Sequence, residues 1–343
     1  MKSILVTGGA GFIGSHFIQH LLHTPTNFIL INLDALTYAP NQELAKSFEA
    51  DKRYKLVKGN ICDLKLIQQL FEQYQFDSVF HFAAESHVDN SISGPSLFIQ
   101  TNINGTFNLI ETAKQTWMNG PFDIKPEFKH ARFHHVSTDE VYGSLDETGY
   151  FLESTPYAPN SPYSASKASS DFLVRCYNKT YGLNITISNC SNNFGPHQHG
   201  EKLIPTIIRN ALHRKPIPIY GDGKNIRDWL YVADHCDAIL TIFQKGKTGE
   251  TYNIGTRNEK NNLELCKLIC KQLDQLYPRI DNQSYIDLIT FVTDRPGHDQ
   301  RYAINPDKIE TELNWKAKGN FNTHLNETLQ FYIDAYEPAR QPR

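Results

Sequence analysis

The sequence contains no long run of apolar residues. Its longest apolar stretches, such as residues 28–31, fall far short of the roughly 20 residues that cross a bilayer. A short apolar run follows Met1 and Lys2, but glycines at positions 8, 9 and 11 end it before the core of a signal peptide forms. We therefore expect no membrane partner and a cytoplasmic location.

The sequence also lacks an excess of charge of one sign. Lysine and arginine number 34 against 37 aspartate and glutamate residues, which gives a formal net charge of −3 at pH 7. That balance argues against a nucleic-acid partner, because such proteins usually carry a strongly basic surface. With 40% hydrophobic and 21% charged residues over 343 positions, the composition indicates a globular protein of one large or two modest domains.

Cysteine is scarce, and a chain of this length does not need disulfides. Cys266 and Cys270 are spaced to share a helix face, and we interpret them as small apolar residues in a buried stripe. No second cysteine or histidine pair lies nearby at ligand spacing. Histidine doublets at 134–135 and 197–199 are expected by chance among fourteen histidines. No metal site is predicted.

The first half of the chain alternates short apolar runs with helix-length segments. This alternation indicates βαβ units and predicts an α/β fold, a Rossmann-type doubly wound parallel sheet with a smaller C-terminal substrate-binding α/β region. The expected strands are residues 3–7, 28–32, 54–58, 78–82, 132–137 and 184–189, and the expected helices are 11–22, 64–74, 97–117 and 162–181. Turn signals crowd in after about residue 190. We therefore predict a cofactor domain at 1–189 and a nucleotide-binding region at 190–343, with segments near 225–245 returning to the first domain.

Three glycines follow the first expected strand directly. Gly8, Gly11 and Gly14 allow a tight turn and let the backbone approach a pyrophosphate at the start of a helix. Asp34 ends the next strand, 20 residues after Gly14, where a carboxylate meets the ribose hydroxyls of a dinucleotide. Because that carboxylate repels a 2′-phosphate, the pattern favours NAD over NADP.

A second constellation carries the chemistry. Tyr163 and Lys167 are four residues apart on an expected helix, hence on one face and ~6 Å apart along its axis. The ammonium and a positive nicotinamide ring are expected to lower the pKa of the phenol, making it a general base. Thr138, Asp139 and Glu140 follow an expected strand at the carboxyl edge of the sheet, where ligands bind. Hydride transfer needs only the tyrosine, so two further carboxyls indicate elimination of water by an acid and a base.

With these residues in view, the chain resembles the dTDP-glucose 4,6-dehydratases of the extended short-chain dehydrogenase/reductase superfamily. The resemblance runs nearly end to end, and its most specific motifs are Thr138-Asp139-Glu140 and the run DRPGHD at 294–299. The other motifs are TGGAGFIGS at 7–15, HFAAESHVD at 81–89, STDEVY at 137–142, YSASKASSD at 163–171, NCSNNFGP at 189–196, EKLIP at 201–205 and GDGKNIRDW at 221–229.

The resemblance implies a role for each residue of the constellation. Tyr163, held by Lys167, takes the proton of the sugar's 4-hydroxyl as hydride leaves carbon 4 for NAD, and Thr138 bonds the same oxygen. Glu140 then removes the hydrogen on carbon 5, while Asp139 protonates the 6-hydroxyl, which leaves as water. Hydride returns to carbon 6, and Glu140 returns a proton to carbon 5. The implied product is a nucleotide 4-keto-6-deoxy sugar.

The resemblance also implies contacts to both ligands and a homodimer packed through the helices near 97–117 and 162–181. The implied substrate contacts are His87, Asn192, Lys202, Leu203, Pro218, Tyr220, Arg227, Asn262, Arg295 and His298. The implied cofactor contacts, besides the glycines, Tyr163 and Lys167, are Phe12, Ile13, Asp34, Asn60, Ile61, Ala83, Thr101 and Asn193. Arg227 and Arg295 are suited to a diphosphate, since a guanidinium binds phosphate oxygens in pairs.

Three departures from the family pattern bear on ligand preference. Asn60 replaces an aspartate at the expected adenine edge, Asn90 replaces an arginine, and residues 197–200 differ from the family's more apolar sequence. The choice between thymine and uracil stays open. The alternatives are a UDP-sugar 4,6-dehydratase, a nucleotide-sugar 4-epimerase, which has no use for Asp139 and Glu140 as an elimination pair, and a non-catalytic NAD-binding regulator.

Overall fold

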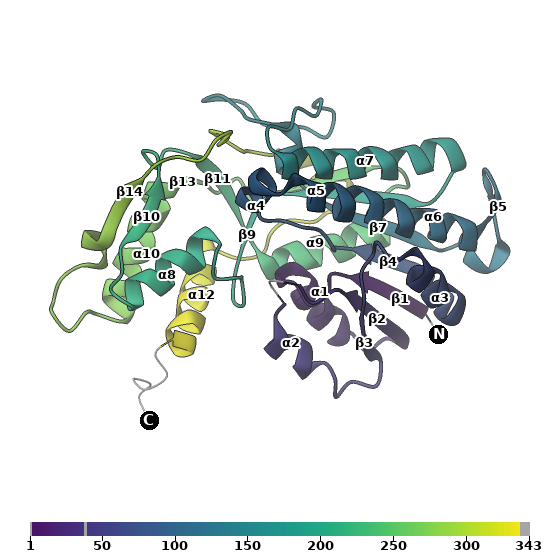
Figure 1. Ribbon diagram of the computed structural model, residues 1–343, viewed down its shortest axis with the longest axis horizontal. Coiled ribbons are helices and arrows are strands. Elements are labelled where there is room, and N and C mark those ends of the chain that lie inside the picture. Colours follow the sequence, from purple (N-terminus) through teal and green to yellow (C-terminus); the bar gives the residue numbers. More distant parts are fainter. Residues whose placement is uncertain (1, 38–39, 337–343) are drawn as a thin grey trace.

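The computed structural model describes residues 2–37 and 40–336 of the chain, and a seven-stranded parallel sheet forms its centre (Figure 1). The spatial order of its strands is β12 (Thr251–Ile254), β8 (Ile185–Cys190), β7 (Arg132–Thr138), β4 (Ser78–His81), β1 (Lys2–Thr7), β2 (Phe28–Asp34) and β3 (Tyr54–Lys58). The order reverses between β1 and β4. In open α/β sheets a ligand crevice forms at such a point, outside the carboxyl ends of the strands.

Helices cover both faces of this sheet, because its strands alternate apolar side chains between two cores. Val6 faces a core with α1 (Phe12–Leu22) and α9 (Val232–Lys245), while Leu5 faces a second core with α3, α6 and α7. The bounds of these last three helices are α3 (Leu64–Tyr74), α6 (Thr106–Trp117) and α7 (Pro162–Tyr181). The doubly wound arrangement predicted from the sequence is confirmed.

Two details differ from the expected elements. The segment 97–117 is not one helix but α5 (Pro95–Phe98), the π-helical η1 (Ile99–Gly105) and α6. Thr106 Oγ1 donates to the carbonyl of Asn102 at 2.6 Å where η1 ends. π-Helical turns such as η1 occur frequently at functional sites. The seventh strand, β12, was missed because its four residues follow the point where the regular alternation ends.

A second region carries its own core and lies beside the sheet in Figure 1. Its helices pack around two small sheets, of order β13-β11-β9 and β10-β14. The elements are β9 (Asn192–Phe194), α8 (Leu203–Leu212), β10 (Ile217–Tyr220), β11 (Ile226–Tyr231), β13 (Glu259–Asn261), α10 (Asn262–Leu276), β14 (Ile289–Val292) and α12 (Phe321–Tyr336). Cys266 and Cys270 are fully buried in this core, as interpreted from the sequence.

Chain segments cross between the two regions. Helix α9 packs against α1, and β12 pairs with β8 in the large sheet, whereas β11 pairs with β9 and β13. The division near residue 190 stays a prediction. The remaining elements are α2 (Gln42–Ser47), α4 (Val88–Ser93), β5 (Met118–Gly120), β6 (Asp123–Ile124), η2 (Pro126–Phe128), η3 (Asp139–Tyr142), η4 (Tyr285–Leu288) and α11 (Asp307–Leu313). None of the described helices has the length and apolarity to span a membrane.

Candidate active site

The glycine turn between β1 and α1 leaves an open helix N-terminus. Gly8 has a positive φ of 72°, and a Cβ on Gly14 would lie 2.3 Å from the carbonyl oxygen of Gly8, so no side chain fits there. Helix α1 begins after Gly11 with no side-chain cap and no acidic residue in its first turn. Its first N–H groups and helix dipole therefore favour an anion such as a pyrophosphate.

Asp34 ends β2 beside this turn. Its Oδ2 accepts from the N–H of Ala10 and its Oδ1 from the N–H of Leu36, both at 2.8 Å. Burial raises the pKa of the carboxyl, and the two N–H groups oppose that shift. Each carboxylate oxygen has a further lone pair for a ribose hydroxyl. The turn and Asp34 together fit a dinucleotide.

The other predicted cofactor contacts differ in their exposure and in whether they have hydrogen-bond partners within the chain. Phe12 and Ile13 occupy the first turn of α1, and Ala83 follows β4, its N–H 3.4 Å from Thr7 Oγ1. Thr101 lies in η1 and is partly exposed.

Three predicted cofactor contacts have partners within the chain. Ile61 is a core residue, while the side-chain oxygen of Asn60 accepts from the N–H of Cys62 at 2.8 Å. Asn193 is engaged on both sides: its Nδ2 donates to the carbonyl of Ser191, and its Oδ1 lies 2.9 Å from Nδ1 of His235. Contacts of these residues with a cofactor stay predictions.

The two predicted carboxyls stand where β7 ends. Thr138 caps the short helix η3, its Oγ1 accepting from the N–H of Glu140 at 3.3 Å. Asp139 is 2% exposed, and its Oδ2 has no hydrogen-bond partner among the described residues. Ser164 of α7 donates to Oε2 of Glu140 at 3.1 Å. The carboxyl of Glu140 is thereby held against the helix that carries Tyr163.

Capping residues in the sequence set both ends of helix α7. Ser161 caps it by accepting from the N–H of Ser164, Pro162 takes the first position, and Gly182 ends it in the left-handed conformation. Tyr163 and Lys167 thus lie on the inner face, and Lys167 Nζ donates to the carbonyl of Val136 at 2.9 Å.

The pKa of Tyr163 does not follow the simple expectation. Burial and then the charge of Glu140 raise the pKa of the phenol well above its usual value. Burial lowers the pKa of Lys167. A lower pKa for the phenol therefore depends on the positive ring of a bound oxidised cofactor as well as on Lys167, and that lowering stays a prediction.

Asp139 and Glu140 share the influence of Arg227 but otherwise differ in their electrostatic surroundings. Burial and the neighbouring Glu140 raise the pKa of Asp139 well above its usual value. Burial also raises the pKa of Glu140, but three cations oppose this shift, namely Arg295, Arg227 and Lys202. Separated environments of this kind let one carboxyl act as an acid while the other acts as a base.

The three cations come from distant parts of the chain. Arg227 lies in β11, 5% exposed, with its guanidinium 4.1 Å above the ring of Tyr302 and Nη2 donating to the carbonyl of Asp299. Lys202 precedes α8, and Arg295 follows β14. The structure brings these predicted residues to one carboxyl, an arrangement that suits a diphosphate.

Residues 86–89, where α4 begins, lie on the other side of this cluster of cations. Lys202 Nζ donates to the carbonyl of Ser86 at 3.2 Å, and Nη1 of Arg295 lies 3.5 Å from Oδ1 of Asp89. His87 Nε2 lies 3.7 Å from Oε2 of Glu201. Lys202 and Arg295, two of the cations suited to a diphosphate, thus contact the first region across the crevice.

The remaining predicted substrate residues lie further into the second region. Tyr220 is 42% exposed and its ring centroid lies 6.4 Å from that of His298, whose Nδ1 is 2.7 Å from Asp294 Oδ1. Asn262 starts α10 with a buried Oδ1 that has no partner among the described residues. Pro218 lies in β10, Asn192 begins β9 and Leu203 begins α8, all partly buried.

Sequence analysis missed several residues that touch this machinery. Asp171 lies one turn beyond Lys167, and this i, i+4 spacing was a usable signal. Ser164 is adjacent to Tyr163, but nothing in the pattern showed that it would reach Glu140. The contacts of Asp89 and Tyr302 join residues about 200 and 75 positions apart, so no local pattern could reveal them.

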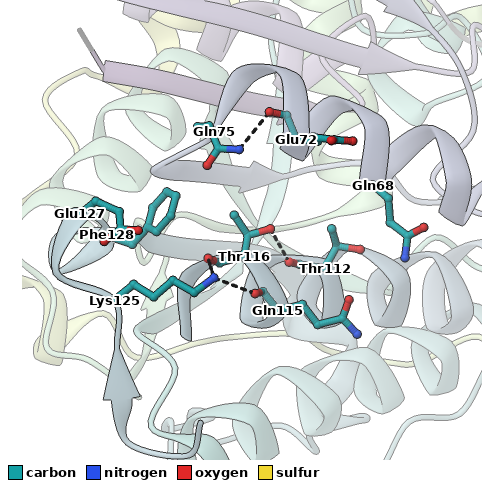
Figure 2. Close-up of a pocket in the computed structure, with 9 residues that line it drawn as sticks. All are labelled: Gln68, Glu72, Gln75, Thr112, Gln115, Thr116, Lys125, Glu127 and Phe128. Atoms are coloured by element: carbon teal, nitrogen blue, oxygen red, sulfur yellow. Dashed lines mark hydrogen bonds between the residues drawn. The ribbon is translucent and has the colours of Figure 1, made fainter. Parts of the chain in front are cut away.

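A polar groove of about 310 Å³ lies elsewhere, between α3 and α6, and belongs to none of the predicted sites (Figure 2). Lys125 Nζ lies across it and donates to the carbonyl of Thr116 at 2.7 Å. Within residues 2–37 and 40–336 no group of three or more histidine, cysteine, aspartate or glutamate residues is arranged to hold a metal ion.

Comparison with known proteins agrees with this geometry. The model of the GDP-mannose 4,6 dehydratase family matches residues 5–328. The probable dTDP-glucose 4,6-dehydratase of Sinorhizobium fredii is 53% identical over 331 residues, covering 96% of this chain and 93% of its own length. The dTDP-glucose 4,6-dehydratase of Haemophilus influenzae is 52% identical over 337 residues, covering 97% and 98%.

Among solved structures, the chain is similar to DesIV, the dTDP-glucose 4,6-dehydratase of Streptomyces venezuelae, crystallised with NAD bound. The TM-score is 0.86 at 42% sequence identity, covering 98% of this chain and 100% of that one. Shared sequence and shared fold along nearly the whole chain lead to one assignment: this protein belongs to the dTDP-glucose 4,6-dehydratase family.

Proposed function

We propose that the protein dehydrates dTDP-glucose to dTDP-4-keto-6-deoxyglucose with NAD as its resident cofactor, which makes it a lyase. The observation that carries this proposal is the buried Asp139 and the partly buried Glu140 beside Tyr163 and Lys167. An epimerase or a simple reductase needs only the tyrosine and lysine. NAD, when bound, supplies the site that accepts hydride from carbon 4 and gives it back at carbon 6.

The chain's own groups handle the protons. The phenol oxygen of Tyr163 takes the proton of the 4-hydroxyl, while Thr138 Oγ1 bonds the same oxygen. Glu140, oriented by Ser164, takes the proton from carbon 5, which the 4-ketone has made acidic. Asp139 gives its proton to the 6-hydroxyl, which leaves as water. Glu140 then returns its proton to carbon 5 as hydride is delivered to carbon 6. The raised pKa of Asp139 supports this role, because an acid must keep its proton at neutral pH.

The nucleotide is held by the second region in this proposal. Arg227, Arg295 and Lys202 bind the diphosphate, and Pro218 and Tyr220 flank the base. The remaining substrate contacts are His87, Asn192, Leu203, Asn262 and His298. The cofactor occupies the region 1–189, with its pyrophosphate on the N-terminus of α1.

Incubation with dTDP-glucose tests the proposal, with UDP-glucose in parallel. The expected product develops the near-ultraviolet absorbance that 4-keto sugars show in alkali, and it forms faster from dTDP-glucose. Formation of only the carbon-4 epimer would replace the dehydratase assignment with an epimerase. Equal turnover of both nucleotides would remove the preference for thymine.

We also infer a cytoplasmic homodimer. Leu97, Ile99 and Phe107 on one helical segment and Phe172 on α7 are each more than two-fifths exposed, and these helices pack side by side. Such a row of apolar side chains favours a second copy of the chain. All six cysteines are free thiols, which suits a reducing compartment. Phe172→Glu is expected to yield a monomer in analytical ultracentrifugation, and an unchanged dimer would contradict this interface.

A further inference from the structure

A buried carboxylate that the proposed mechanism does not use lies one turn beyond Lys167. Asp171 of α7 has no exposed surface. Its Oδ2 accepts from Ser137 Oγ at 2.9 Å and from the hydroxyl of Tyr157 at 2.8 Å, and its Oδ1 lies 3.1 Å from Nε2 of His135. A carboxylate taken out of water persists only where charges or donors compensate it.

The donors around Asp171 favour its ionised form. The guanidinium of Arg175 lies 4.6 Å above the ring of Tyr157 and donates to its hydroxyl at 2.6 Å, and Asn189 Nδ2 donates to the same oxygen. That hydroxyl is therefore left to donate to Asp171. Burial raises the pKa of the carboxyl, and Lys167, Ser137, Tyr157 and Arg175 all oppose this shift.

Lys167 faces the complementary problem. Lys167 is 4% exposed, and its ammonium donates to a backbone carbonyl, a neutral partner. The titratable groups whose charges interact with it are His81 of β4, His135 of β7, Cys190 of β8 and Asp171. Burial lowers the pKa of both histidines well below neutrality and raises the pKa of the thiol, so these three groups are uncharged at neutral pH. Asp171 is the anion of this set. It stands four residues from Lys167 on the same face of α7, and its Oδ2 accepts from Ser137, the neighbour of Val136, whose carbonyl accepts from Lys167 Nζ.

We propose that Asp171 is a positioning residue, the counter-ion that keeps the buried ammonium of Lys167 protonated while its bond to Ser137 fixes the end of β7 that carries Thr138. This inference rests on the proposed function only for the role of Lys167. Tyr163, Lys167 and Asp171 then lie four residues apart in succession on one face of α7. The effect on Tyr163 is indirect, because Asp171 acts through Lys167.

The pH profile of kcat/KM in Asp171→Asn tests the inference. Removing the counter-ion lets Lys167 lose its proton at lower pH, so the alkaline limb moves down by about one pH unit or more, the range that a nearby opposite charge produces. The acid limb does not move up, because loss of a negative charge does not disfavour the phenolate of Tyr163. A purely structural role would lower the plateau and leave both limbs in place, which would overturn the proposal.

Tyr157→Phe is the matched control. It removes a hydrogen bond to Asp171 but keeps the charge, so its alkaline limb should stay within a few tenths of a pH unit of wild type. A limb that moves as far as in Asp171→Asn would assign the effect to packing and contradict the counter-ion role.

A direct titration separates this inference from the proposed function. Lysine labelled with ¹³C at the ε-carbon reports the protonation of Lys167 by NMR without substrate, in wild type and in Asp171→Asn. A lower midpoint in the variant is expected, and equal midpoints would overturn the inference even in an active enzyme. If the variant does not fold, the wild type decides: an ammonium that loses its proton below neutral pH would overturn it. Failure of wild type to convert dTDP-glucose would overturn the proposed function alone.

Discussion

The two ends of the crevice are built in different ways. At the cofactor end, the anion site is made of backbone N–H groups from one short stretch, the turn that runs from Gly8 into α1. At the sugar end, the site is made of buried or partly buried side-chain charges from Glu140, Lys202, Arg227 and Arg295. The backbone site forms from one short stretch of sequence, whereas the side-chain site forms only when distant parts of the chain meet in the fold. Substitutions should therefore act through backbone space at one end and through charge at the other.

The largest expected effect is at the sugar end. Asp139→Asn removes the proposed acid and should slow loss of water by ~10²–10⁴-fold, the usual contribution of a general acid. Oxidation at carbon 4 should slow much less, because Tyr163 and Lys167 remain. Stopped-flow absorbance of the reduced cofactor separates the two steps. Equal slowing of both would show that Asp139 supports the site rather than the elimination.

At the cofactor end, two alanine substitutions should differ from each other. A Cβ on Gly14 would lie 2.3 Å from the carbonyl of Gly8, whereas a Cβ on Gly11 meets that oxygen at 3.3 Å. Gly14→Ala should thus cost ~1–3 kcal/mol of unfolding free energy, typical of overpacking, and lose cofactor affinity as well. Gly11→Ala should lose affinity with a smaller loss of thermal stability, because its contact is less crowded and the proposed function places the pyrophosphate on this turn. Calorimetry and cofactor titration check both, and equal melting temperatures would contradict the contrast.

A smaller effect is expected for the cation at the crevice mouth. Arg295→Gln should raise KM for the nucleotide sugar about tenfold or more, since hydrogen bonds to charged groups contribute ~1.5–3 kcal/mol. Its kcat should fall by a smaller factor, because loss of this cation also raises the pKa of Glu140. Asp89→Asn, which removes only the partner of Arg295, should change KM less. Initial-rate kinetics provide the test, and a loss confined to kcat would move Arg295 from binding to catalysis.

The smallest expected effect is on stability against pH. The folded-state pKa of Asp139 is raised, so the folded protein binds more protons than the unfolded chain above the unfolded value of 3.8. That imbalance lowers stability as pH rises towards the folded pKa. In Asp139→Asn this loss is absent, so the stability of the variant relative to wild type should increase between pH 4 and neutrality. A difference independent of pH, measured by urea unfolding, would indicate that Asp139 has an ordinary pKa.

The same contrast explains how far sequence could predict the molecule. Apolar periodicity and the glycine spacing located six of the seven strands and the turn before α1, because both signals are local. The common helix face of Tyr163 and Lys167 could be predicted for the same reason. The cross-region contacts, such as Arg295 with Asp89 and Arg227 with Tyr302, depend on chain segments that meet only after folding. The direction of the pKa shift of Tyr163 was also beyond the sequence, because burial sets it.

The most direct test of the central claim follows one hydrogen atom. When dTDP-glucose carries deuterium on carbon 4, we expect the label on carbon 6 of the 4-keto product, because the hydride that leaves the ring returns to the carbon from which water departed. NMR of the product shows its position. Deuterium that stays on carbon 4, in a sugar that keeps its 6-hydroxyl, would contradict the account.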